Sequence, residues 1–65
     1  MTRKVLEKLP EIARTNLEWL RKEYKSELGD KDVARAKAAW YVKGLKDAGL
    51  ITERERQFLF IYTTV

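Results

Sequence analysis

Apolar residues recur every three or four positions along most of this chain, which is the spacing of an amphipathic α-helix. Gly29 and Gly49 divide the pattern, and each stands where one periodic segment ends, as a C′ glycine does. Asp30 predicts an N-cap after the first glycine, and Thr52 with Glu55 has the spacing of a capping box after the second. We therefore expect an all-α fold, a compact three-helix domain. The expected helices cover roughly residues 10–28, 31–48 and 53–62.

Pro10 leaves two ways for the first helix to begin. Proline fits the first helical position, but inside a helix it removes a hydrogen bond and bends the axis. The segment VLEKL before it is also periodic. The helix therefore either starts at residue 10 behind a short leading turn, or extends back to residue 3 with a kink.

The first helix carries two apolar rows that together cover about half of its circumference. A helix in a three-helix domain touches two neighbours, so we expect both rows to lie in the core. The alternative is that the second row forms an exposed ridge for a partner. The main row is Leu6, Leu9, Ala13, Leu17, Leu20, Tyr24 and Leu28, and the second row is Val5, Ile12 and Trp19.

The second helix has a packing side of small and apolar residues, and the small ones, including Gly44, would let a neighbouring helix approach closely. Lys37 falls in the middle of this side, where its stem can pack while its charged end reaches water. The alternative for Lys37 is a contact with a ligand anion or a partner carboxylate. Trp40 lies at the border of the two sides, where a tryptophan either covers a core or anchors an interface. The expected packing residues are Val33, Ala34, Ala38, Tyr41, Leu45 and Ala48.

The segment FLFIY, residues 58–62, is apolar on every side of a helix, and two companion helices can cover only part of it. If Phe58, Leu59 and Tyr62 face the core, Phe60 points away and is exposed beside Ile61. Exposed apolar patches of this kind mark interaction sites. The β-branched and aromatic composition also suits a strand, but the capping box favours a helix that frays from residue 63.

Composition excludes most chemistry. The 65 residues contain no Cys and no His, so neither a disulfide nor an ordinary zinc site is available, and the single Ser26 has no base to activate it. We expect no catalytic residue, no cofactor and no metal. The longest apolar run is far too short to span a membrane, so we expect a cytoplasmic protein with no membrane partner. The net charge of +4 is spread over segments of mixed sign, which is typical of a solvated surface.

The preferred hypothesis is a small non-enzymatic protein–protein interaction module. Its simplest version is self-association through the apolar C-terminal helix, in an accessory or inhibitor protein of a bacterium or mobile element. The expected interface residues are Ile12, Trp19, Trp40, Phe60 and Ile61.

The alternative hypothesis is a nucleic-acid-binding module of the helix-turn-helix type, with DAGLIT as its tight turn. Against it, Glu53 and Glu55 occupy the first turn of the last helix, where a phosphate would otherwise bind. The residues that would contact nucleic acid are Arg35, Lys43, Lys46, Arg54, Arg56 and Gln57.

Overall fold

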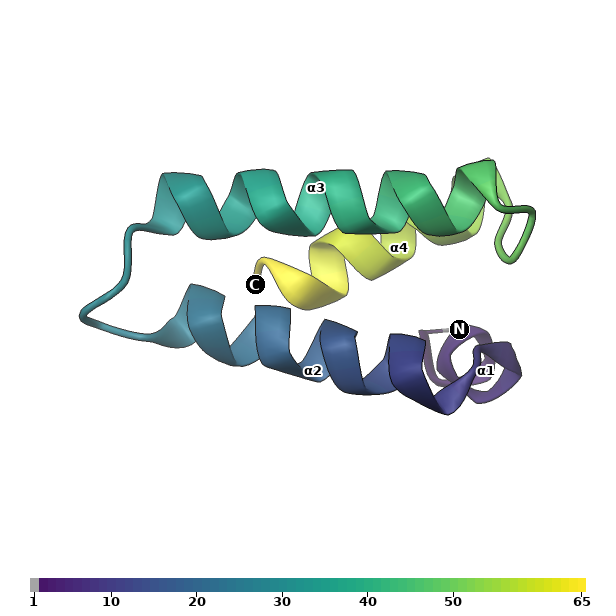
Figure 1. Ribbon diagram of the computed structural model, residues 1–65, viewed down its shortest axis with the longest axis horizontal. Helices are drawn as coiled ribbons and strands as arrows, with labels where there is room; N and C mark the ends of the chain where they lie inside the picture. Colours follow the sequence, from purple (N-terminus) through teal and green to yellow (C-terminus); the bar gives the residue numbers. More distant parts are fainter. Residues whose placement is uncertain (1) are drawn as a thin grey trace.

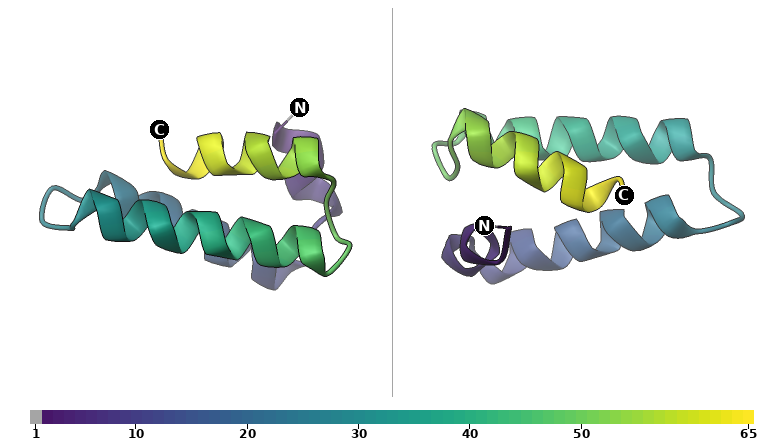
Figure 2. Two further views of the ribbon diagram at one scale, coloured as in Figure 1. Left: turned by 90° about the horizontal axis from the view of Figure 1, so that it is seen from above. Right: turned by 180° about the vertical axis from the view of Figure 1, so that it is seen from behind.

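The computed structural model describes residues 2–65, which form four α-helices and no strand. Helices α2 and α3 run antiparallel as a hairpin, and α1 and α4 both lie against the same side of it (Figures 1 and 2). The predicted all-α class is therefore confirmed, with the leading segment as an additional short helix. The helices are α1 (Thr2–Lys8), α2 (Glu11–Lys25), α3 (Lys31–Asp47) and α4 (Glu53–Thr63).

Pro10 separates α1 from α2 rather than kinking one helix. Its backbone is extended, with φ −56° and ψ 150°, and its carbonyl accepts the first backbone hydrogen bonds of α2. Figure 1 shows α1 nearly end-on while α2 lies lengthwise, so the chain changes direction sharply at this point. The leading segment is thus neither a mere turn nor an extension of α2. Lys8, at the end of α1, donates to both carboxylate oxygens of Glu55 on α4, at 2.5 and 2.7 Å.

The end of α2 differs from the prediction. The helix stops at Lys25, and Ser26 is already extended. Leu28 is fully exposed, so its assignment to the core was wrong. Gly49 is the only residue in the described part of the chain with a positive φ, so Gly29 is not the C′ glycine that the sequence suggested. Leu28 is exposed because α4 ends midway along the hairpin, so no third helix lies at this end to bury an apolar residue (Figure 1).

The remaining helix termini follow the sequence signals. The Asp30 side chain accepts from the backbone N–H groups of Asp32 and Val33, and Thr52 and Glu55 form the reciprocal capping box. These side chains satisfy backbone donors that no helical carbonyl can reach. Both predicted N-caps are confirmed.

Gly49 ends α3 in a Schellman motif. Its φ is +78°, and the backbone N–H groups of Gly49 and Leu50 donate to the carbonyls of Lys46 and Leu45, at 2.9 and 3.0 Å. This left-handed conformation costs any residue with a Cβ more than it costs glycine. The prediction of a C′ glycine here is confirmed.

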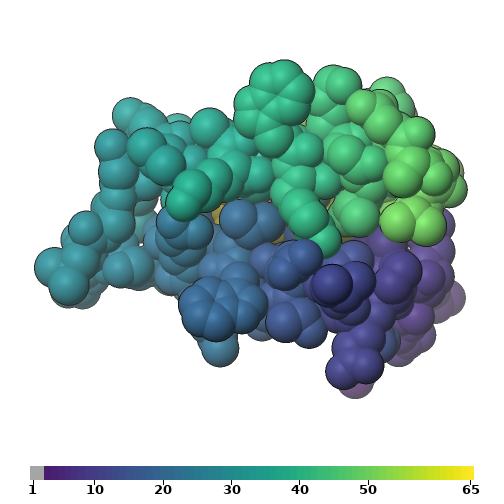
Figure 3. Space-filling model, viewed as in Figure 1, coloured from purple at the N-terminus to yellow at the C-terminus, as the bar shows by residue number. Residues whose placement is uncertain are grey.

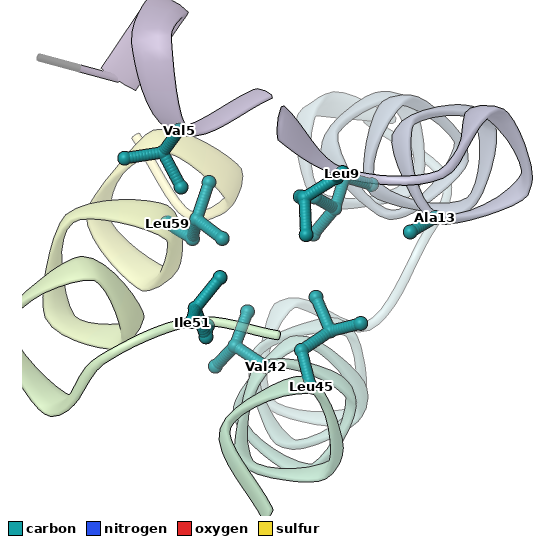
Figure 4. Packing of buried hydrophobic residues seen from close by; sticks show 8 residues of the cluster. Val5, Leu9, Ala13, Val42, Leu45, Ile51 and Leu59 are labelled. Carbon is teal, nitrogen blue, oxygen red and sulfur yellow. The ribbon is translucent and has the colours of Figure 1, made fainter. Parts of the chain in front are cut away.

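The core lies between the hairpin and the layer formed by α1 and α4 (Figure 4). Val42 and Ile51 belong to it although no sequence signal singled them out, while Val33 and Ala48, which were expected to pack, are exposed. Gly44 is exposed too, with open space where its Cβ would stand. The core cluster consists of Val5, Leu9, Ala13, Leu17, Val42, Leu45, Ile51 and Leu59.

The second apolar row of the first helix does not exist as one face. Val5 is buried, whereas Ile12 and Trp19 are 72% and 70% exposed. The break before Pro10 places Val5 on a different helix, so the seven-residue spacing no longer puts these residues on one side. The expectation that this row packs inside was wrong for Ile12 and Trp19, and the alternative of an exposed ridge holds for them.

The apolar end of α4 is better covered than expected. The segment is helical through Thr63, whose hydroxyl is buried and donates to the Leu59 carbonyl at 2.6 Å. Phe60 is half-buried and packs against the core, so the prediction that it is exposed was wrong. Helix α1 packs on α4 and contributes Val5 to the core cluster that Phe60 packs against, so α4 has a neighbour that a three-helix arrangement lacks. Ile61 alone in this stretch is largely exposed, at 56%.

Substitution by alanine should change the free energy of unfolding in opposite directions at Gly44, inside α3, and at Gly49, just after its end. Gly49→Ala should lower the free energy of unfolding by about 1 kcal/mol, because alanine resists a positive φ. Gly44→Ala should raise it by roughly 0.5–1 kcal/mol, because alanine favours a helix interior and its methyl group meets only open space. Urea unfolding followed by circular dichroism measures both changes. Equal effects of the two substitutions would contradict the assigned backbone conformations.

Candidate interaction surface

One side of the α2–α3 hairpin is not covered by α1 or α4, and we call it the open face; it faces the viewer in Figures 1 and 3. A groove runs along the open face between the two helices. Most of its lining is apolar, although it is open to solvent. The lining residues are Asn16, Trp19, Leu20, Val33, Ala36, Lys37, Trp40 and Tyr41.

Trp19 and Trp40 stand on opposite walls of this groove. They are 70% and 71% exposed, so together they leave a large apolar area in water. Two contacts tie the walls together on either side of them: the Asn16 amide donates to the Tyr41 hydroxyl at 3.0 Å, and Lys37 pairs with Glu23 at 2.7 Å. Since residue numbers rise along one antiparallel helix and fall along the other, these contacts place Trp19 and Trp40 at the same level.

Ile12 extends the apolar surface of α2 beyond the groove. It is exposed and precedes Asn16 and Trp19 by four and seven residues, so the three lie on one side of the helix. Three of the five predicted interface residues, Ile12, Trp19 and Trp40, are thus brought onto the open face. Phe60 and Ile61 belong to α4, in the layer on the other side of the hairpin.

Sequence reasoning missed part of this surface. Leu20 and Val33 line the groove, although they were assigned to the core. Val33 precedes Trp40 by seven residues and Ala36 precedes it by four, which is the spacing of one helical face. That row was a usable signal, but the sequence alone does not tell which of two apolar rows on a helix is covered.

Three of the predicted nucleic-acid contacts surround the carboxylate of Glu53. Arg56 approaches it at 2.5 Å and Lys46 at 3.2 Å, and the Gln57 amide donates to it at 3.1 Å. Hydrogen bonds from Arg56 and then Lys46 lower the pKa of Glu53 from the usual 4.5 to about 2. A phosphate approaching this end of α4 therefore meets a carboxylate that stays ionised.

The other candidate nucleic-acid contacts are also engaged. Arg35 lies 3.5 Å from Asp32. Lys43 pairs with Asp47 at 2.9 Å, and this contact lowers the pKa of the Asp47 carboxyl. The Arg54 guanidinium lies 5.8 Å from the centre of the Phe58 ring. Exposed ion pairs are weak, but each carboxylate cancels part of the positive potential that nucleic acid would need.

Within residues 2–65, no group of three or more acidic side chains is placed to hold a metal ion. None of the helices formed by these residues has the length and the apolar character of a membrane span.

The contacts of Glu53 predict a pH dependence of stability. Because its pKa is lower in the folded chain, its contribution is fully present above pH 4.5 and is lost as the pH falls towards about 2. The difference in free energy of unfolding between wild type and Glu53→Gln should therefore narrow over this range. Urea titrations of both proteins at several pH values measure it. A difference that does not change with pH would show that the ion contacts of Glu53 do not stabilise the fold.

The open face, with a tryptophan on each wall of an apolar groove, is the most distinctive surface of this chain. No family model, curated protein or solved structure matches the chain.

Proposed function

We propose that this chain is a small non-enzymatic protein–protein interaction module that binds its partner through the open face. The observation that carries the proposal is the pair of exposed tryptophans across an apolar groove. Tryptophan is the residue most often found as an energetic anchor of interfaces, and exposed apolar patches of soluble proteins mark such sites. The absence of cysteine suits a reducing compartment, so we propose a cytoplasmic location. The small size and the composition of the chain suit an accessory or inhibitory role.

The proposed surface differs from the one that the sequence favoured. Phe60 packs against the core, which leaves Ile61 as an isolated exposed residue on α4. Single exposed apolar residues are common on monomeric proteins and need no partner. Trp19 and Trp40 instead line one apolar groove, and a contiguous exposed apolar patch of this kind marks an interaction site.

The nucleic-acid alternative has less support. Four of its five cationic side chains lie in ion pairs with carboxylates of the same chain. Nucleic-acid sites instead present clustered positive charge, because phosphate contacts supply most of the affinity.

Affinity capture from the cells that produce the protein tests the proposed surface. Replacing both tryptophans, Trp19→Ser with Trp40→Ser, should reduce recovery of specifically bound protein, other copies of this chain included, by at least tenfold, because each anchor contributes on the order of 2 kcal/mol. Circular dichroism should show unchanged helicity, since both side chains are largely exposed. Ile61→Ser is the matched control and should retain the bound protein. Equal recovery by all three proteins would exclude the open face as the binding surface.

A further inference from the structure

Resting on the proposed function, we propose that the partner is a second copy of this chain. Two copies join by their open faces, so that the α2–α3 hairpins form an antiparallel four-helix bundle with the four tryptophans at its centre. Such a contact has two-fold symmetry, and it requires a surface that is complementary to itself. The open face meets this requirement in its charges, in its aromatic residues and in its shape.

The charges of the groove are balanced across it. Glu23 on α2 faces Lys37 on α3 at 2.7 Å, and Lys37 is the one charged residue that lines the groove. A two-fold axis parallel to the groove places α2 of one copy over α3 of the other without changing the level along the helices. Glu23 then lies over the partner's Lys37, and Lys37 over the partner's Glu23. The four charges alternate around the axis, so each copy supplies the complement that the other needs.

The tryptophans obey the same operation. Trp19 and Trp40 lie at the same level on opposite walls, bracketed by the Asn16–Tyr41 and Glu23–Lys37 contacts. The axis therefore brings Trp19 of each copy against the partner's Trp40. Two indole pairs form, and aromatic pairs add to the free energy of association beyond what their buried area supplies.

The shape of the face allows the approach. Gly44 follows Lys37 by seven residues and Trp40 by four, so it lies on the open face, and nothing stands within 4 Å of where its Cβ would be. By the same antiparallel register, the partner's Ile12 lies over Gly44. The Ile12 side chain can then fit into the space that the missing Gly44 side chain leaves, as a knob fits into a hole on a facing helix.

The size of the face predicts a reversible dimer. The molecule extends 33 Å by 19 Å in the plane of the open face, which gives a projected footprint of roughly 600 Å² per copy. Two copies then bury about 1,200 Å² in total, at the lower end of specific interfaces. We expect a monomer–dimer equilibrium that depends on concentration rather than a permanent dimer.

Sedimentation equilibrium over a concentration series from micromolar to millimolar tests the dimer. Wild type and Ile61→Ser should show the mass of a dimer at the upper end of the series. Trp19→Ser with Trp40→Ser should remain monomeric there, with unchanged helicity. A wild type that stays monomeric throughout, or a dimer that forms equally well without the tryptophans, would overturn the inference.

Charge reversal tests whether the partner is a second copy in this arrangement. Glu23→Lys makes the charged pair wholly positive and Lys37→Glu makes it wholly negative, so each variant alone should dimerise at least tenfold more weakly than wild type. An equimolar mixture should restore the dimer as a heterodimer, which a mass tag on one variant identifies. A purely internal role for the Glu23–Lys37 pair predicts no rescue on mixing, and that result would overturn the proposed pairing.

The outcomes also separate this inference from the proposed function. If wild type is monomeric but captures a different protein in a manner that needs Trp19 and Trp40, self-association is wrong and the module still binds through the open face. If neither a dimer nor a captured protein depends on the tryptophans, both proposals are wrong.

Discussion

The structure depends on the break in the backbone at Leu9 and Pro10. Proline has no N–H to continue a helical hydrogen-bond ladder, and the chain before it leaves the axis of α2. This change of direction lets α1 pack on α4, with Val5 and Leu9 both in the core. Lys8 adds a contact between these helices by pairing with Glu55, whose carboxylate also closes the capping box of α4. Glu55 thus links the capped start of α4 to the placement of α1.

The same arrangement explains why one surface is left exposed. Both α1 and α4 lie on one side of the hairpin, so none of the helices formed by residues 2–65 covers the other side. Small domains bury a smaller share of their surface than large ones, so apolar residues left over must face water or a partner. Trp19 and Trp40 are such residues, and their exposure follows from the layering rather than from any local feature of α2 or α3.

Ion pairs keep the described surface of α3 and α4 from being strongly positive. The net charge is +4, yet most cations of α3 and α4 lie beside carboxylates. Glu53 holds two of these cations and keeps a pKa of about 2. The balanced pair of Glu23 and Lys37 leaves the groove without a net charge of its own, which is the basis for proposing a second copy as the partner.

The sequence by itself determined the helical class, both N-caps and the turn at Gly49, because each of these signals acts within a few residues along the chain. It also predicted Trp19 and Trp40 as interface residues, which stays a prediction. The tertiary structure decided which apolar rows are covered: it exposed Leu28, buried much of Phe60 and joined the two tryptophans across one groove. Those outcomes depend on where α1 turns and where α4 ends, and helical periodicity records only that a face is apolar, not what packs against it.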